Sequence, residues 1–336
     1  MEKTKVALVV GKSRRENILT ALNLLREDVK KKISGKGRVV IKPNFVTVHN
    51  QLAATHVETI RAILDFLKPI CKEKIIIAEK AAVGTTNEGF KNYHYYDLKK
   101  DYDVDFVDLA EDKFVTEEIY DASFKKIKIG IARTILESDF LISVTPAKTH
   151  DVGVVTLALK NVVVGSLNYA PLIHQGFKAF NLNLSRLAKR IHPHLSIIDG
   201  YEGMGGNGPV SGVAVKSKFA VASLDCLAAD IVATKIMGFD PQKIGYLSLC
   251  QKENLGEGDL AKIEILGDKL TGVKISYPKP STYEKQLGWE TLPTFSEKLK
   301  AKVITLVYPP MKRSKISQIR GFESVKRIVK KTFGFS

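Results

Sequence analysis

Residues 38–45 read RVVIKPNF, residues 57–71 read VETIRAILDFLKPIC, and residues 74–78 read KIIIA. The first and third stretches are short apolar runs that favour strands, and the segment between them is predicted to be a helix. A strand, a helix and a second apolar strand in this order are typical of a parallel sheet with helices on its faces. Pro43 interrupts the first strand, because proline cannot donate a hydrogen bond to a neighbouring strand.

The same alternation continues on both sides of this unit. Further strands are expected at residues 5–10, 104–109, 124–129, 140–145, 195–198, 220–223 and 262–266. Further helices are expected at residues 15–31, 131–137, 154–163, 177–191, 226–237 and 244–252, with one more ending near residue 98. The sequence therefore predicts an α/β fold with a largely parallel sheet, helices on both faces of that sheet, and an irregular basic C-terminal extension.

Three parts are expected along the chain. Residues 1–270 form the α/β body, as one unit or as two lobes. Residues 271–300 contain three prolines and are expected to be an irregular linker or excursion. Residues 301–336 are expected to form a basic amphipathic tail.

Positive charge is concentrated in that tail. The chain has 336 residues and a net charge of +16, and residues 301–336 contain nine Lys and Arg against one Glu, which is half of that charge. A helix over residues 322–335 would gather apolar side chains near one face: Phe322, Val325, Ile328, Val329 and Phe333. Such a helix suits an anionic membrane surface or RNA, and it equally suits docking of its apolar stripe on the protein's own body.

Composition argues against several classes of protein. Hydrophobic residues make up 44% of the chain, as in globular proteins, and no apolar run approaches the roughly 18 residues of a membrane-spanning helix. The three cysteines, Cys71, Cys226 and Cys250, are far apart, which argues against a disulfide framework and a zinc ribbon. We therefore expect a cytoplasmic protein without an iron–sulfur cluster, with peripheral membrane contact as a role for the tail.

Polar residues occur where two of the predicted strands end. Ligands of open α/β sheets bind beyond the carboxyl ends of the strands. Lys42 and Asn44 leave the strand that contains VVI, and Lys148 and His150 follow the strand that contains FLISV. The lysines are candidates for binding an anion, and His150 is a candidate for moving a proton or ligating a metal.

A second group of polar residues lies in otherwise apolar surroundings. Lys160 and Asn161 interrupt the run VVTLALKNVVVG, where an unpaired lysine would be costly to bury. The lysine therefore reaches water or meets an anion. His174 follows after a loop and is a further candidate acid or base.

A glycine-rich segment follows the strand that ends in Asp199. Five of the nine residues at 200–208 are glycines, which let backbone N–H groups approach a ligand closely. The binding candidates in this segment are Gly203, Gly205, Gly206, Asn207 and Gly208. Pro209 follows and no helix begins there, so a dinucleotide site is not expected. Asp230 lies within the apolar stretch CLAADIVATKIM and is expected to be buried with a partner.

Seven short motifs in the chain resemble those of a known family, in the same order over about residues 1–270. They are IKPNFV at 41–46, KTH at 148–150, LKNVVVG at 159–165, IIDGYEGMGGNGP at 197–209, SLDCLAAD at 223–230, MGFDP at 237–241 and LGEGDL at 255–260. On these motifs the chain resembles the conserved family called domain of unknown function 362. That family has no settled general activity, so the resemblance implies little about the reaction.

The chain departs from this family in two respects. Many members carry an appended ferredoxin-like cysteine cluster, which this sequence lacks, so a redox role is not implied here. The family's glycine segment usually reads GMEGNGP, whereas this chain has Gly205 in place of the glutamate and has Glu202 three positions earlier. A more distant similarity to nickel-pincer lactate racemases concerns the fold alone.

The leading hypothesis is an enzyme that binds a small carboxylate- or phosphate-bearing substrate in a pocket lined by lysines and glycines. In one version, His150 or His174 removes a proton next to the carboxylate and the lysines stabilise the enolate. In another, His150, Asp199 and Asp230 hold a divalent metal that assists group transfer. A third hypothesis is a binding protein that uses residues 311–336 on RNA or an anionic membrane surface.

Overall fold

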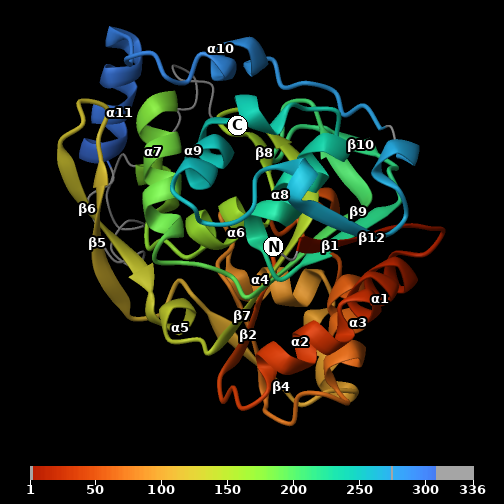
Figure 1. Cartoon of the computed structure of the whole chain (residues 1–336). Coiled ribbons are helices and arrows are strands. Elements are labelled where there is room, and N and C mark those ends of the chain that lie inside the picture. The colour runs from red at the N-terminus through yellow and green to blue at the C-terminus, as the bar shows by residue number, and fades with distance from the viewer. Residues whose placement is uncertain (1–2, 274, 308–336) are drawn as a thin grey trace.

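The computed structural model describes residues 3–273 and 275–307 of the chain (Figure 1). Its centre is a ten-stranded sheet in which eight strands follow the order β12-β1-β11-β9-β7-β2-β3-β4. In that order they are Ile263–Gly267, Thr4–Val10, Phe219–Ser223, Leu195–Gly205, Phe140–His150, Val39–Lys42, Ile75–Glu79 and Val104–Asp108. Two short strands complete the sheet, since β10 (Val213–Val215) pairs with β9 and β8 (Val154–Thr156) pairs with β7.

The sheet is mixed and largely parallel. The β2–β3, β3–β4, β2–β7, β7–β9 and β1–β12 pairs are parallel, whereas β11 runs antiparallel to both β1 and β9. The unit predicted from residues 38–78 forms β2, helix α3 (Val57–Leu67) and β3. The predicted α/β class and largely parallel sheet are therefore confirmed.

Helices cover both faces of the sheet (Figure 1). One face packs against helices in the first hundred residues: α1 (Arg14–Leu24), α2 (Arg26–Ile33), α3, α4 (Thr86–Asn92) and the 3-10 turns η1 (Gln51–Ala53) and η2 (Tyr95–Lys100). The other face packs against α6 (Ala158–Gly165), α7 (Phe177–Ala188), α8 (Cys226–Ile236) and α9 (Gly245–Lys252). Each face therefore has its own apolar core. Alternate residues of β7 point to opposite faces, since Ile142 lies in the core under α1–α4 and Leu141 in the core under α6–α9.

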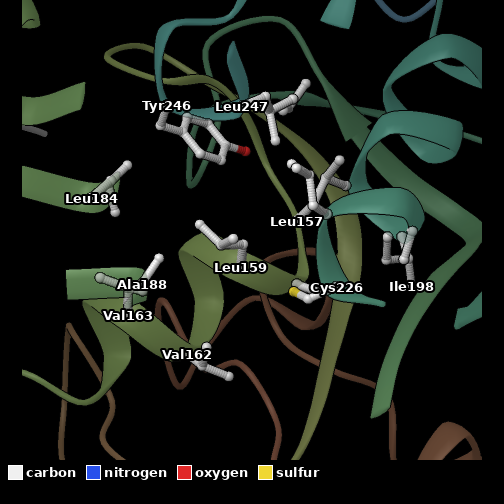
Figure 2. Packing of buried hydrophobic residues seen from close by; sticks show 14 of the residues in the cluster. Leu157, Leu159, Val162, Val163, Leu184, Ala188, Ile198, Cys226, Tyr246 and Leu247 are labelled. Atoms are coloured by element: carbon white, nitrogen blue, oxygen red, sulfur yellow. The ribbon is translucent and has the colours of Figure 1, made fainter. Parts of the chain in front are cut away.

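The apolar core between the sheet and α6–α9 contains α6, the helix that carries Lys160 and Asn161 of the LKNVVVG motif. Figure 2 shows Leu159, Val162 and Val163 of α6 among side chains of α7, α8 and α9. The remaining polar face of α6 is therefore directed away from this apolar cluster, towards the ends of β2 and β7.

Several boundaries differ from those expected. The predicted helix at 15–31 divides at Leu25 into α1 and α2, and the predicted helix at 154–163 begins as strand β8 before α6. A separate hairpin of β5 (Phe114–Tyr120) and β6 (Lys126–Ala132) replaces the single strand expected at 124–129. The glycine-rich segment is not a loop throughout, because β9 continues to Gly205 and pairs with β10.

The segment expected to be irregular contains short helices. They are α10 (Tyr283–Leu287) and the start of α11 (Phe295–Val307). The remaining short elements of the described chain are α5 (Arg133–Leu136), η3 (Ala170–Ile173), η4 (Pro241–Lys243), η5 (Leu260–Lys262) and η6 (Leu270–Gly272). The helix predicted within residues 322–335 lies outside the described residues. In the part of the chain that the structure does describe, no helix is long and apolar enough to cross a bilayer.

Candidate functional site

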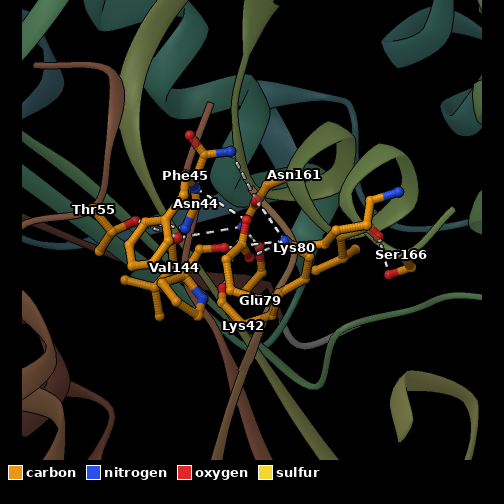
Figure 3. Close-up of polar contacts among 12 residues, drawn as sticks. Lys42, Asn44, Phe45, Thr55, Glu79, Lys80, Val144, Asn161 and Ser166 are labelled. Carbon is orange, nitrogen blue, oxygen red and sulfur yellow. Dashed lines mark hydrogen bonds and ion pairs between the residues drawn. The ribbon is translucent and has the colours of Figure 1, made fainter. Parts of the chain in front are cut away.

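The ends of β2 and β3 meet in a buried ion pair (Figure 3). Lys42 Nζ lies 2.6 Å from Glu79 Oε2, and both side chains are at most 2% exposed. Lys42 Nζ also donates to the Asn161 side-chain oxygen at 3.2 Å and to the Pro43 carbonyl at 3.1 Å. Three acceptors, one of them a carboxylate, match the three N–H groups of an ammonium. Burial raises the pKa of Glu79, and the charge of Lys42 acts in the opposite direction.

The last residue of the LKNVVVG motif makes room for this ion pair. A β-carbon at Gly165 would lie 2.3 Å from Lys42 Nζ, closer than any side chain could tolerate. Glycine at this position is therefore explained by the burial of the lysine. Glu79 Oε1 accepts from the backbone N–H of Phe45 at 3.0 Å, which satisfies the second carboxylate oxygen.

Lys148 is buried next to this pair but has different partners. It is fully buried, and its Nζ donates to the side-chain oxygen of Asn44 and, at 2.9 Å, to the carbonyl of Ala53. Burial and the nearby charges of Lys160 and Lys42 hold the pKa of Lys148 well below its usual value. Two neutral acceptors match the two N–H groups of an uncharged amine, so we assign Lys148 as neutral.

Asn161 links helix α6 to the strand ends. Its amide nitrogen donates to the Ser143 hydroxyl at 3.1 Å and to the Lys42 and Val144 carbonyls, both at 3.3 Å. Its oxygen accepts from Lys42 and, at 3.1 Å, from Asn44 Nδ2. The predicted residues Lys42, Asn44, Lys148 and Asn161 are therefore brought together, as one hydrogen-bonded network.

Lys160 is next to Asn161 in sequence but belongs to a second cluster. Its Nζ lies 5.8 Å from the centre of the Phe180 ring, and the residue is 4% exposed. In the described part of the chain no hydrogen bond to this nitrogen is formed, but it is not one of the fully buried unpartnered atoms either, so it keeps some contact with solvent. Burial lowers the pKa of Lys160 to about 7, against the opposing charge of Asp151.

The two histidines of this cluster are stacked. The rings of His150 and His174 are 6.2 Å apart at 13°, and the His174 ring lies 5.2 Å from that of Phe180. Burial, followed by the charge of Lys160, lowers the pKa of His150 to about 4 and that of His174 to about 3. Both imidazoles are therefore neutral at pH 7, and Lys160 is the group of this cluster that titrates near neutrality.

Two contacts of His150 bear on its tautomer. Its Nδ1 accepts from the backbone N–H of Val152 at 2.9 Å, which suits a proton on Nε2. The side-chain oxygen of Asp151 lies 3.0 Å from the same Nδ1. A carboxylate oxygen at this distance suits a proton on Nδ1, so the Val152 and Asp151 contacts of this nitrogen favour opposite tautomers.

Asp230 holds the helix on which both clusters depend. Its two oxygens accept from the backbone N–H groups of Ala158 at 2.8 Å and Leu159 at 3.1 Å, at the start of α6. The residue before α6, Leu157, has no side chain that could cap the helix, so the carboxyl group of Asp230 on α8 supplies the cap. Burial raises the pKa of Asp230 to about 8, while these two hydrogen bonds act in the opposite direction.

Two further family motifs support Asp230 indirectly. Asp225 caps α8 through the Ala228 N–H at 2.9 Å and accepts from the Glu257 N–H of the LGEGDL motif at 2.8 Å. In the MGFDP motif, Gly238 has a φ of 88° beyond the end of α8, a conformation that favours glycine. Both motifs therefore fix the ends of the helix that carries Asp230.

Asp199 lies in different surroundings from the histidines. Its carboxylate contacts Arg14 Nε at 2.9 Å and accepts from the Thr59 hydroxyl at 2.5 Å and the Tyr201 N–H at 3.0 Å. Asp199 and Asp230 are thus each bonded to other parts of the chain. In the described ranges, no group of three or more His, Cys, Asp or Glu is positioned to hold a metal ion.

The glycine-rich segment is packed against the chain itself. A β-carbon at Gly203 would lie 2.2 Å from the Tyr277 hydroxyl, and one at Gly205 would lie 2.5 Å from Pro278. The Gly206 N–H donates to the Pro278 carbonyl at 2.7 Å, and Asn207 Oδ1 accepts from the Ser281 N–H at 2.8 Å. Gly208 has the carbonyl of Thr149 against it in the same way. Close packing against residues 277–281 and β7 accounts for these small residues.

Three residues of the site were not predicted from the sequence. Glu79 ends a strand, as Lys42 does, so the same strand-end reasoning could have identified it. Asp151 directly follows the KTH motif and could have been found by extending that motif by one residue. Phe180 gave no usable signal, because an aromatic residue in an apolar helix resembles an ordinary core residue.

Known proteins resemble this chain in sequence and in fold. A family model described as domain of unknown function (DUF362) matches residues 39–235. The thylakoid-associated protein sll1697 of Synechocystis sp. is 27% identical over 226 residues, which cover 65% of this chain and 68% of that protein. The lactate racemase apoprotein of Thermoanaerobacterium thermosaccharolyticum aligns with a TM-score of 0.46 and 16% identity, over 70% of this chain and 57% of the racemase chain. This chain spans less than two thirds of that racemase, and the likeness carries no conclusion about the site.

Proposed function

This chain belongs to the DUF362 family, and we propose that it is an enzyme that performs acid–base chemistry on a small molecule bearing a carboxylate or phosphate. The observation that carries the proposal is the Lys160 side chain, which is 4% exposed and lies over the Phe180 ring beside the stacked rings of His150 and His174. A lysine that is not engaged in the fold and titrates near pH 7 is suited to proton transfer.

Each residue of the cluster has a defined part in this proposal. Lys160 takes up or releases the proton, and its charged form attracts the anion. The neutral imidazole of His150 offers its ring N–H to a carboxylate or enolate oxygen. The buried ammonium of Lys42 is paired with Glu79 and its three N–H groups are used by the chain itself, so it takes no direct part in proton transfer.

The roles differ from those expected on sequence alone. Lys42, Asn44 and Lys148 support the site from within the fold, and the glycine-rich segment has its own packing role. The metal-assisted alternative has less support, because Asp199 and Asp230 are bonded away from the histidines. The acid–base version with Lys160 as the titrating group is therefore preferred.

The Lys160→Met variant tests this proposal by calorimetry with two small anions, sulfate and malonate. We expect wild-type protein to bind at least one of them and the variant to bind it about tenfold or more weakly, which is about 1.4 kcal/mol. Lys178→Met is the matched control, since Lys178 also lies over a phenylalanine ring, at 5.9 Å from Phe124, outside the cluster. Equal affinity in the wild type and the Lys160 variant would contradict the proposal.

A second candidate function, binding to an anionic membrane surface, is favoured by one feature of α11. Two apolar side chains of this helix are exposed, Phe295 (83% exposed) and Leu299 (48%), as is Leu292 (68%) three residues before it. Phe295, Leu299 and the exposed Lys302 follow one another at intervals of four and three residues, so they share a face, and the exposed Lys298 lies beside it. Apolar and basic side chains on one helix face suit the boundary of an anionic bilayer better than they suit RNA.

Two further facts agree with this candidate. Residues 301–336, which include the last part of α11, carry nine Lys and Arg against one Glu. The relative from Synechocystis is named for its association with thylakoids. Both lead to the proposal that this end of the chain contacts membranes peripherally.

Sedimentation with vesicles tests the membrane candidate. We expect the full chain to bind phosphatidylcholine vesicles that contain phosphatidylglycerol, and to bind pure phosphatidylcholine vesicles much less, because the basic residues need anionic lipid. The triple variant Leu292→Ser, Phe295→Ser, Leu299→Ser should bind several-fold less, and removal of residues 311–336 should reduce binding further. Binding that is unaffected by either change, or that occurs only with RNA, would reject this candidate.

A further inference from the structure

The groups proposed to act on a substrate are almost closed off from solution. Lys160 is 4% exposed and His150 is 5% exposed, while the side chain of Asp151 next to them is 54% exposed. A carboxylate or phosphate of the size of malonate is much larger than the small part of the amine that meets solvent. Such a molecule therefore reaches Lys160 or His150 only if part of the chain moves aside.

Residues 282–294, which we call the strap, lie against the turn that carries His150. The strap contains α10 and leads into α11 on the outside of the fold (Figure 1). Gln286 of α10 is 3% exposed, and its Nε2 donates to the His150 carbonyl at 3.0 Å. Its Oε1 accepts from the Val154 N–H at 2.5 Å. One side chain of the strap therefore holds both ends of the turn from β7 to β8.

Two more contacts of the strap surround the cluster. The Thr282 hydroxyl donates to the carbonyl of Asp151 at 2.6 Å, within the same turn. A β-carbon at Gly176 would lie 3.4 Å from Pro293 Cγ, so the strap also lies close to the loop that follows His174. The strap thus contacts both of the segments that carry the two histidines.

The strap is attached to the body between two fixed ends. Before it, the Ser281 N–H donates to Asn207 Oδ1 at 2.8 Å, and after it, Ala301 and Ile304 of α11 are buried. Within the described residues, no backbone–backbone hydrogen bond joins the strap itself to the body, so its own contacts are made by side chains. A segment held in this way opens at a lower free energy than the sheet beneath it.

We propose that the strap is a lid over the Lys160 cluster and that Gln286 is its latch. The inference rests on the acid–base function proposed above and adds how a substrate reaches that site. When Gln286 releases the turn that carries His150, the strap moves away between its two fixed ends and a small anion enters. When the strap returns, the two hydrogen bonds of Gln286 form again and water is excluded from the bound anion.

Labelling of His150 in the full chain tests the lid. Diethyl pyrocarbonate modifies neutral imidazoles, and peptide mass mapping gives the rate at each histidine. We expect Gln286→Ala to label His150 about tenfold faster than the wild type, because the loss of two hydrogen bonds raises the open fraction. Lys285→Ala, at an exposed neighbour on α10, is the matched control and should keep the wild-type rate. His94, with a side chain that is 75% exposed, is the internal reference for all three proteins.

Hydrogen exchange tests the same opening in the wild type, without any variant. The Val154 N–H is bonded to Gln286, so it exchanges when the latch opens. Overlapping peptides should show exchange at Val154 far sooner than at Ile142, which lies in the middle of β7 and is fully buried. Exchange of both amides at the rate of global unfolding would overturn the lid, as would equal labelling of His150 in the wild type and Gln286→Ala.

Malonate separates failure of the lid from failure of the proposed function. Slower labelling of His150 in the presence of malonate, together with faster labelling in Gln286→Ala, supports both. Faster labelling in Gln286→Ala that malonate does not slow supports the lid and contradicts anion binding at this cluster. Protection by malonate with no effect of Gln286→Ala rejects the lid and leaves the acid–base function standing.

Discussion

Glu79→Ala is expected to lower the free energy of unfolding by about 3–5 kcal/mol, because it leaves the buried ammonium of Lys42 without its counter-charge. The pair is 2.6 Å long and both side chains are at most 2% exposed, so water cannot replace the carboxylate. The backbone N–H of Phe45 also loses its acceptor. Chemical denaturation followed by circular dichroism measures the change.

Two companion variants make this result specific. Glu118→Ala breaks an ion pair of similar length, 2.9 Å to Lys126, in which both partners are exposed, and no comparable loss is expected. Glu79→Gln keeps an acceptor for Phe45 but removes the charge, so its stability should fall between those of the wild type and Glu79→Ala. If Glu79→Ala and Glu118→Ala have the same stability, the buried ion pair does not hold these strand ends together.

Asp230→Ala is expected to cost about 2–4 kcal/mol, the next largest loss, because it removes the acceptor for two buried N–H groups at the start of α6. Asp225→Ala also removes two backbone acceptors, but Asp225 is partly exposed and water can take its place, so about 1 kcal/mol is expected there. Equal stability of the two variants in denaturation experiments would contradict this assignment.

The charge state of Asp230 adds a dependence on pH. Its pKa is about 8 in the folded chain and near 3.8 in the unfolded chain, so the folded state holds the extra proton between these values. The contribution of this group to stability is therefore present below about pH 4 and is lost as the pH rises towards 8. In Asp230→Asn this part of the slope should disappear, and a slope identical to that of the wild type would show that the carboxyl titrates elsewhere.

The fold was largely predictable because apolar runs report directly on which segments are buried. The unit formed by β2, α3 and β3 was identified from three short stretches of sequence. Strand β6 was expected two residues early, and its partner β5 was missed, because charged residues interrupt β5 and most of its side chains are not buried. The extension of β9 to Gly205 was missed because its glycines indicate a loop in sequence, while in the fold they admit residues 277–278.

The candidate site was predictable as a set of residues but not as a set of roles. Lys42, Lys148 and Lys160 look alike in sequence, each a lysine beside an apolar run. Their difference depends on how many acceptors surround each nitrogen, three, two or none, and those acceptors come from distant segments such as Glu79 and Ala53. Sequence position carries no information about this count.

Asp230 illustrates the same limit. An aspartate within an apolar helix was correctly expected to be buried and paired, but metal binding and capping of another helix predict the same residue type. The backbone N–H groups that bind it belong to α6, about seventy residues away in sequence. An aspartate that appears catalytic in the sequence therefore positions the residues that act.

The affinity for sulfate as a function of pH tests the central claim most directly, since the charge of sulfate is constant between about pH 6 and pH 9. If Lys160 titrates near 7 in a site that binds anions, the wild-type affinity should fall as the pH rises through about 7, by up to about tenfold per pH unit. The Lys160→Met variant should bind weakly and show no such fall. An affinity that is independent of pH in the wild type, or a pH dependence that survives in Lys160→Met, would contradict the assignment of Lys160 as the reactive group of this site.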